Sequence, residues 1–181
     1  MCSFLLLSAR CKLQTEHFHW HSYRRVPSSF IPRVWQSWVL DAGSLTKRLQ
    51  QASNGSFKVR VKAQQYAKPT MSERRALNLS IGRYALIREV DLLCHDKVWV
   101  SARSVIPLHS LVGKERQLKC LGSKPLGAFL FASRSMKREA IQLTRTSGGN
   151  QPTYARRSVF RLHNKPLLVA EKFHTSVIHH S

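Results

Sequence analysis

Tyr84-Ala-Leu-Ile-Arg-Glu-Val-Asp-Leu-Leu93 has the strand-like pattern from which the fold of this chain can be worked out. It is followed by the turn-forming segment Cys94-His-Asp-Lys97 and by a second apolar run, Val98 to Ile106, which Pro107 ends. Two such runs around a short polar turn predict a β-hairpin. Because hairpin strands pair antiparallel, the hairpin indicates an antiparallel sheet.

Further strands are expected on both sides of this hairpin. Ser56 to Gln64 alternates, with Phe57, Val59, Val61 and Ala63 on one face and Lys58, Arg60 and Lys62 on the other, as in a half-buried strand with a solvated basic face. A second hairpin is expected from Ser158 to Phe173, turned by His163-Asn-Lys-Pro166. Met136 to Arg145 is a weaker strand candidate, and Thr146 to Pro152 is expected to be a flexible loop.

Short helices are expected between the strands. Val34, Trp35, Trp38 and Val39 have helical spacing, and Ser44 opens a second short helix. Further helical segments are expected around Glu115 to Leu121 and from Leu126 to Phe131, whereas the segment with Pro69 and Ser72 is expected to be a loop. The predicted class is α+β, a single domain with a mainly antiparallel sheet and flanking short helices.

Length and composition limit the organisation of the chain. The 181 residues, 43% of them hydrophobic, suffice for one domain with one sizeable core. No apolar run approaches the ~20 residues that cross a bilayer, so we expect no membrane span and a cytoplasmic protein. The four cysteines form no CxxC pair and no zinc spacing, which favours free thiols in a reducing compartment.

Residues 1–25 differ from the rest and are expected to be a poorly ordered extension ahead of a domain at 26–181. His17, His19 and His21 alternate and would share one strand face, but the sequence fixes no further metal ligand beside them, so we assign no metal site. The acid-poor start also has features of an organelle transit segment, an alternative that ranks lower.

The net charge of +21 points to an anionic partner without naming it. Basic residues are scattered along the chain, and no zinc finger or RNP-type motif accompanies them. Charge therefore leaves open both a nucleic-acid-binding protein and a positive surface around a pocket for a small anion.

Two charged residues interrupt the alternation of the predicted strands. Arg88 shares the more apolar face of its strand with Leu86 and Val90, so it needs a carboxylate from a ligand or from a core glutamate. Glu171 lies among Leu167, Val169 and Phe173 on one face of the last strand, a setting that suits acid or base chemistry or a hydrogen bond to a ligand hydroxyl. The two residues could frame a pocket or simply pair with each other; the sequence leaves this open.

Four blocks carry a family resemblance from Trp38 to about Phe173. They are Ser44-Leu-Thr-Lys-Arg, Ile87-Arg-Glu-Val with Ala102-Arg-Ser-Val-Ile-Pro107, Leu121-Gly-Ser-Lys-Pro-Leu-Gly127, and Arg156-Arg-Ser with Lys165-Pro-Leu-Leu-Val-Ala-Glu171. In order and spacing they resemble bacterial chorismate pyruvate-lyase, which converts chorismate into 4-hydroxybenzoate and pyruvate at the entry to ubiquinone synthesis.

The resemblance implies roles for particular residues. Arg88 would bind the ring carboxylate of the substrate, Glu171 would meet the ring hydroxyl, and backbone groups at Leu45 and Leu126 would line the pocket. Leu45 replaces the family's methionine, which preserves a main-chain contact but changes the packing over the ligand. Catalysis is assigned to Glu171 and Arg88.

The resemblance also implies a reaction that needs little machinery. Loss of the enolpyruvyl ether makes the ring aromatic, so no cofactor and no metal are expected and positioning supplies much of the catalysis. The hydrogen of C4 goes either to the substrate's own enolpyruvyl methylene or to Glu171 as a base, with a cation beside the leaving enolate. Arg156, Arg157 and Lys165 are candidates for that cation, although a surface charge is the simpler interpretation of each.

The expected partner is chorismate, bound by a monomer with no requirement for nucleic acid. A competing function is a small-acid sensor like the effector domains of GntR-type regulators, but 25 residues cannot encode the winged-helix domain that precedes such sensors. A nucleic-acid-binding protein rests on charge alone and ranks last.

Overall fold

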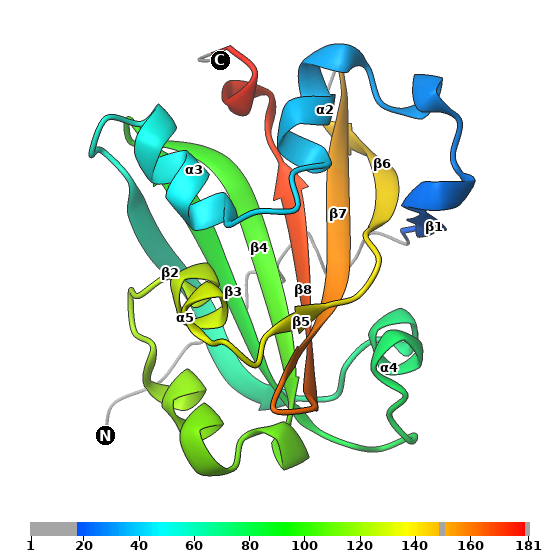
Figure 1. Cartoon of the computed structure of the whole chain (residues 1–181), viewed down its shortest axis with the longest axis vertical. Coiled ribbons are helices and arrows are strands. Elements are labelled where there is room, and N and C mark those ends of the chain that lie inside the picture. Colours follow the sequence, from blue (N-terminus) through cyan, green and yellow to red (C-terminus); the bar gives the residue numbers. More distant parts are fainter. Residues whose placement is uncertain (1–17, 149–150, 180–181) are drawn as a thin grey trace, which may run out of the picture.

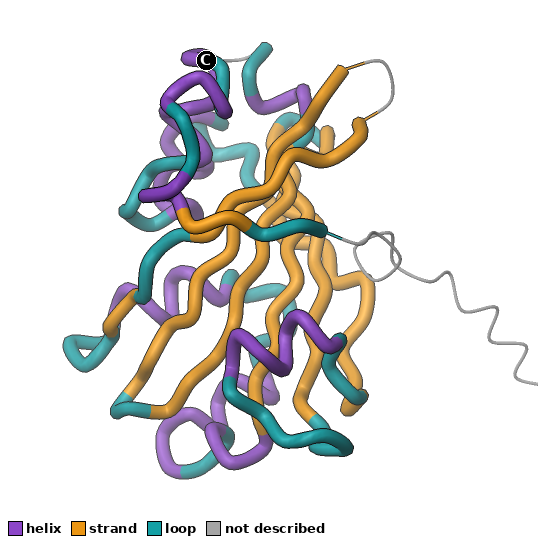
Figure 2. The backbone as a smooth tube through the Cα atoms, turned by 90° about the vertical axis from the view of Figure 1, so that its right-hand side faces the viewer, coloured by secondary structure: helices purple, strands orange, loops and turns teal. Residues whose placement is uncertain are grey.

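A sheet of eight strands forms the centre of the computed structural model, which describes residues 18–148 and 151–179. The spatial order is β1-β6-β7-β8-β4-β3-β2, with β5 beside β7, and each described pair is antiparallel. The strands are β1 (His21–Ser22), β2 (Lys58–Ala67), β3 (Ala85–Cys94), β4 (Lys97–Pro107), β5 (Lys137–Arg138), β6 (Gln142–Gly148), β7 (Gln151–Leu162) and β8 (Lys165–Phe173). Figure 2 shows these strands side by side through the body of the molecule. The predicted α+β class is confirmed.

Both predicted hairpins form around two-residue turns. His95 and Asp96 connect β3 to β4 with φ angles of 50° and 57°, and His163 and Asn164 connect β7 to β8 with 49° and 64°. Positive φ at both central residues matches the right-handed twist of paired strands. Because β4 also pairs with β8, the two hairpins join into one sheet.

The edge strand β2 contains an irregularity that changes which of its side chains share a face. Its register against β3 shifts between Val61 and Ala63, so that Gln64 is paired with Arg88. The extra residue of such a bulge reverses the alternation beyond it. Gln64, and not Ala63, therefore shares a face with Val59 and Val61, and the predicted uninterrupted alternation is wrong.

Helices cover both faces of the sheet. Figure 1 shows α3 (Leu45–Ala52) and α5 (Leu126–Ala132) in front of β2, β3 and β4, and α2 (Arg33–Val39) in front of β7. The opposite face packs against α4 (Met71–Leu77), through Leu77 among other residues. The 3-10 segments are η1 (Tyr23–Arg25), η2 (Ser28–Phe30), η3 (Leu108–Ser110), η4 (Gly113–Cys120) and η5 (Thr175–Val177).

The structure corrects two expectations about segments outside the hairpins. The predicted loop around Ser72 contains α4, whose start is fixed by a capping box between Thr70 and Glu73, a signal that the sequence carried. The predicted loop at 146–152 is largely strand, because β6 runs to Gly148 and β7 begins at Gln151. The longer β7 matters for the site, since it includes Arg156.

In the described part of the chain the apolar core is divided into three clusters, two of them on the face covered by α3 and α5. One of these two gathers Trp35, Trp38 and Leu49 from the helices, and the other gathers Leu118, Leu121 and Leu130. The third cluster lies against α4. Among residues 18–148 and 151–179, no helix is long and apolar enough to cross a membrane. The boundary expected at residue 26 stays a prediction.

Candidate active site

A pocket lies between the two clusters on the face covered by α3 and α5. Strands β2, β3, β4, β7 and β8 supply its floor, and the starts of α3 and α5 supply its cover. Its walls combine apolar and polar side chains: Gly43, Leu45, Thr46, Val59, Arg88, Val90, Leu92, Ala102, Ser104, Pro125, Leu126, Gly127, Leu130, Phe131, Arg138, Arg156, Phe160, Val169 and Glu171. All four residues predicted for the site, Leu45, Arg88, Leu126 and Glu171, are among them.

Arg88 is buried, with 2% of its surface exposed, and faces the pocket from the middle of β3. Its guanidinium donates to neutral acceptors: Nη1 to Gln64 Oε1 at 3.1 Å, and Nη2 to the carbonyls of Gly122 at 2.8 Å and Lys124 at 3.3 Å. Burial lowers the pKa of Arg88. A buried arginine without a carboxylate is costly unless an anion joins it. None of the described partners of Arg88 is a carboxylate, and Glu171 is paired with Arg156. The alternative of a structural ion pair between Arg88 and Glu171 is therefore wrong for the described residues.

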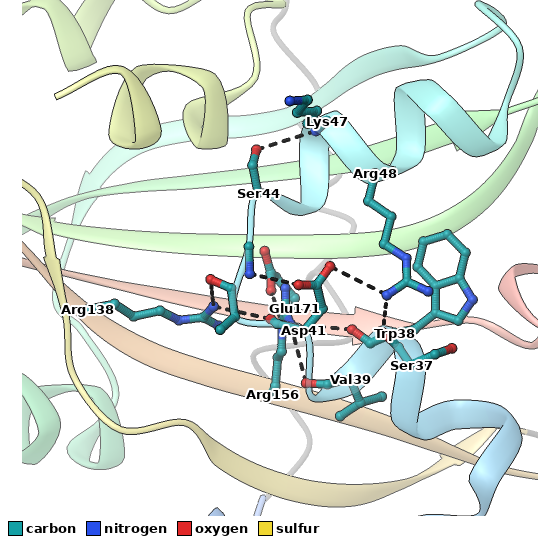
Figure 3. Close-up of polar contacts among 12 residues, drawn as sticks. Ser37, Trp38, Val39, Asp41, Ser44, Lys47, Arg48, Arg138, Arg156 and Glu171 are labelled. Carbon is teal, nitrogen blue, oxygen red and sulfur yellow. Dashed lines mark hydrogen bonds and ion pairs between the residues drawn. The ribbon is translucent and has the colours of Figure 1, made fainter. Parts of the chain in front are cut away.

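Glu171 faces the pocket from β8 and pairs with Arg156 instead. The two residues are opposite each other in the register of β7 and β8, and Arg156 Nε lies 2.5 Å from Glu171 Oε2. Nη1 of Arg156 also donates to the carbonyls of Trp38, Val39 and Asp41, just beyond the end of α2. Figure 3 shows Arg156 between Glu171 and this segment.

Arg138 lies beside this pair. It donates through Nε to Ser158 Oγ at 3.1 Å, and through Nη1 to the carbonyls of Asp41 and Ala42 at 3.3 and 3.2 Å. Burial, together with the neighbouring charge of Arg156, lowers the pKa of Arg138 to about 10. At neutral pH the three arginines and one glutamate of the pocket lining give it a formal charge of 3 − 1 = +2.

The structure distinguishes the three residues that the sequence offered as candidates for the cation beside the leaving enolate. Arg156 is 1% exposed and lines the pocket, so the surface interpretation is wrong for it. Arg157 is also buried, but it donates to Gln142 and Ser72 on the other face, near α4. Lys165 binds the carboxylate of Glu115 at 2.6 Å, away from the pocket lining.

Sequence reasoning named Arg156 only as one of three candidates for the cation, without placing it among the site residues, and it missed Arg138, which also lines the pocket. Arg156 is at an alternate position of the same strand as Ser158, Phe160 and Leu162. A predicted strand that began before Ser158 would therefore have placed Arg156 on the face of Phe160. Arg138 belongs to β5, a strand of two residues whose side-chain direction depends on its pairing with β7. No short-range pattern identifies such a residue.

Leu45 and Leu126 are the first residues of α3 and α5. Ser44 caps α3 by accepting a hydrogen bond from the N–H of Lys47 at 3.3 Å. The first N–H groups of a helix have no acceptor within the helix, so those of Leu45 and Leu126 suit a ligand in the pocket. The two helices touch closely: a Cβ atom on Gly127 would lie 2.6 Å from Thr46 Oγ1.

Two of the alternating histidines, His19 and His21, are described by the structure, and neither lines the pocket. His21 is in β1, paired with Leu143 of β6, and its ring centroid is 5.8 Å from that of Phe30. His17 falls outside the described residues. Within the described chain no group of three His, Cys, Asp or Glu side chains is arranged to hold a metal ion.

Comparisons with known proteins identify relatives of this chain. It is 41% identical over 155 residues to a protein of Methylococcus capsulatus named probable chorismate pyruvate-lyase, covering 79% of this chain and 96% of the relative. It is 34% identical over 152 residues to the chorismate pyruvate-lyase of Hamiltonella defensa, covering 83% of each.

Solved structures show the same fold at low identity. The effector domain of PhnF from Mycobacterium smegmatis superposes with a TM-score of 0.54 and 12% identity, covering 76% of this chain and 92% of that domain. The family model described as chorismate lyase matches residues 15–181. The chain therefore belongs to the chorismate lyase family.

Proposed function

We propose that this protein is a chorismate pyruvate-lyase that converts chorismate into 4-hydroxybenzoate and pyruvate. The observation that carries the proposal is the charge of the pocket: a formal +2, with Arg88 bound only to neutral groups in the described structure. Chorismate is a small dianion, so its two carboxylates balance that charge. The names of the relatives support the same substrate and reaction.

The substrate would lie across the strands, with its ring carboxylate on Arg88 and its hydroxyl toward Glu171. Strand β4 lies between β3 and β8, and Arg88 is opposite Ser104 while Glu171 is opposite Ala102. Two strand spacings and a two-residue offset separate the two Cα atoms by roughly 12 Å. After allowance for the two side chains, this span suits a six-membered ring with groups at opposite ends. Val90, Leu92 and Val169 supply apolar contacts for the ring.

Positioning is the main contribution of the protein to this reaction. The C3–O bond breaks and the electron pair of the C4–H bond forms the last double bond of the aromatic ring. The C4 hydrogen goes to the methylene carbon of the enolpyruvyl group, which leaves as pyruvate, so all atoms of chorismate are found in the two products. In this proposal Glu171, held by Arg156, binds the C4 hydroxyl and is not the base.

A cytoplasmic monomer that supplies 4-hydroxybenzoate for ubiquinone synthesis is part of the same proposal. The sensor alternative has no specific support, because the likeness to effector domains shows the fold alone.

The direct test is to mix the purified protein with chorismate, without added metal or cofactor, and to measure both products. We expect 4-hydroxybenzoate and pyruvate in equal amounts, at a rate proportional to the protein concentration. Spontaneous breakdown of chorismate in a protein-free sample is the control. A rate equal to that control would contradict the proposed function.

A further inference from the structure

At the Glu171 end of the pocket, the positive charge of Arg138 and Arg156 exceeds the negative charge beside them. Arg156 is paired with Glu171, whereas Arg138 donates to a hydroxyl and to carbonyl oxygens. The nearby carboxylate of Asp41 accepts hydrogen bonds from Gly43 N–H at 2.7 Å and Arg48 at 3.4 Å. Among the residues that the structure describes, one positive charge at this end of the pocket is therefore left without an ion pair of its own.

Both arginines also have N–H donors that are not used in the described hydrogen bonds. Every described hydrogen bond of Arg138 and Arg156 uses Nε or Nη1, and within residues 18–148 and 151–179 none uses Nη2 of either. Both residues line the pocket. Guanidinium groups with free N–H donors in a partly desolvated pocket bind carboxylates strongly and with defined geometry.

The chemical structure of chorismate indicates which carboxylate comes here. The hydroxyl at C4 is next to the ether at C3, and that ether carries the second carboxylate. A substrate with its hydroxyl at Glu171 and its ring carboxylate at Arg88 places the enolpyruvyl group beside Glu171. Building on the proposed function, we infer that Arg138 and Arg156 together form a second subsite, which binds the enolpyruvyl carboxylate.

This subsite would also act on the bond that breaks. As the C3–O bond opens, negative charge develops on the ether oxygen, which becomes the carbonyl oxygen of pyruvate once the methylene has taken the C4 hydrogen. Cations already fixed beside that oxygen stabilise the developing charge without reorganisation. Arg138 is thus assigned contacts with the part of the substrate that the aromatic product lacks.

A purely structural role for these arginines predicts something different. Both donate to Asp41 O in the connection between α2 and α3, and the first residues of α3 cover the pocket. If they served only to hold this cover, their loss would weaken every pocket ligand to a similar extent. The subsite predicts a selective loss, confined to ligands that carry the second carboxylate.

The experiment compares two stable ligands: 4-hydroxybenzoate, and the same compound with a 1-carboxyvinyloxy group at C3, which is aromatic and cannot react. Dissociation constants are measured by calorimetry for the wild type and for Arg138→Gln, a change that spares the Arg156–Glu171 pair. Arg161→Gln is the matched control, because Arg161 belongs to β7 but is 43% exposed and pairs with Glu139.

We expect Arg138→Gln to weaken the dicarboxylate by at least about 20-fold, as for lost hydrogen bonds to a charged group, and 4-hydroxybenzoate by less than about 3-fold. Arg161→Gln should change neither. If Arg138→Gln fails to fold, Arg138→Lys gives the same comparison with a smaller selective loss. Equal weakening of both ligands, or none, would overturn the subsite.

Failure of the subsite is distinguishable from failure of the proposed function. A wild-type protein that forms product from chorismate, combined with an unselective Arg138→Gln variant, overturns only the subsite. A wild-type protein that forms no product overturns the proposed function, whatever the two ligands do.

Discussion

Arg156 of β7 and Glu171 of β8 are directly opposed in the register of their strands and form an ion pair, with Arg156 Nε 2.5 Å from Glu171 Oε2. The Glu171 carboxylate is held by this pair, and Arg88, two strands away, has only neutral partners among residues 18–148 and 151–179. Each end of the pocket therefore has a different chemistry. Arg88 offers an uncompensated positive charge, whereas the Glu171 end offers a fixed acceptor surrounded by arginine donors.

Glu171→Gln tests whether this carboxylate binds or takes a proton. Glutamine keeps an acceptor oxygen for the substrate hydroxyl but has no charge. Because Glu171 is proposed as a binding group, we expect kcat to fall by less than about 100-fold. Steady-state kinetics with chorismate measures this, with Glu139→Gln as the control for an exposed carboxylate. A fall of 1000-fold or more, with the fold intact, would instead identify Glu171 as the general base.

Arg88→Gln removes the proposed partner of the ring carboxylate. The lost charged hydrogen bonds should raise the Kd of 4-hydroxybenzoate by about 10- to 150-fold. Calorimetric titration gives this value, and thermal unfolding shows whether the variant is folded. Arg60→Gln is the control, because Arg60 pairs with Asp91 outside the pocket lining. Unchanged affinity in Arg88→Gln would remove Arg88 from the site.

Gly127→Ala tests the contact between the two helices that cover the pocket. The new methyl group would lie 2.6 Å from Thr46 Oγ1, so α3 and α5 must separate or Thr46 must rotate. We expect a loss of about 1–3 kcal/mol in the free energy of unfolding, measured by urea denaturation. The double variant Gly127→Ala/Thr46→Ala should recover most of the loss, since it removes the clashing oxygen. Additive effects of the two changes would contradict this contact.

Glu115 makes stability depend on pH. Its side chain, 4% exposed, accepts hydrogen bonds from Lys165 Nζ at 2.6 Å and from His163 Nδ1 at 2.8 Å. Burial would raise the pKa of Glu115, but the hydrogen bonds from Lys165 and His163 lower it from 4.5 to about 2. A lowered pKa contributes stability that is complete above pH 4.5 and is lost as the pH falls toward 2.

Glu115→Gln should therefore cost about 1.5–3 kcal/mol of unfolding free energy at pH 7, and its stability should converge with that of the wild type near pH 2. Denaturation curves across this range measure the difference. Glu139→Gln is the matched control, because Glu139 is 45% exposed in its pair with Arg161. A difference that stays constant with pH would show that packing, and not the charge of Glu115, is responsible.

Local patterns were sufficient for the hairpins and for the faces of two strands. The turn at His95 and Asp96 and the alternation around Arg88 and Glu171 are both properties of neighbouring residues, and the structure shows them as predicted. The same reasoning failed at β2, where one bulge reversed the alternation. It failed again at α4, although the capping box of Thr70 and Glu73 was present in the sequence.

By itself the sequence determined the alternation of β3 and β8, the turns of the two hairpins, and the position of Arg88 and Glu171 on the apolar faces of their strands, because backbone geometry repeats over a few residues. Only the tertiary structure decided their partners. The pairing of β4 with β8, and of β7 with β8, brings together residues far apart in the chain, and this placed Arg156 against Glu171 and left Arg88 without a carboxylate in the described structure. Pairing between distant strands depends on the packing of the whole sheet, and no short pattern encodes it.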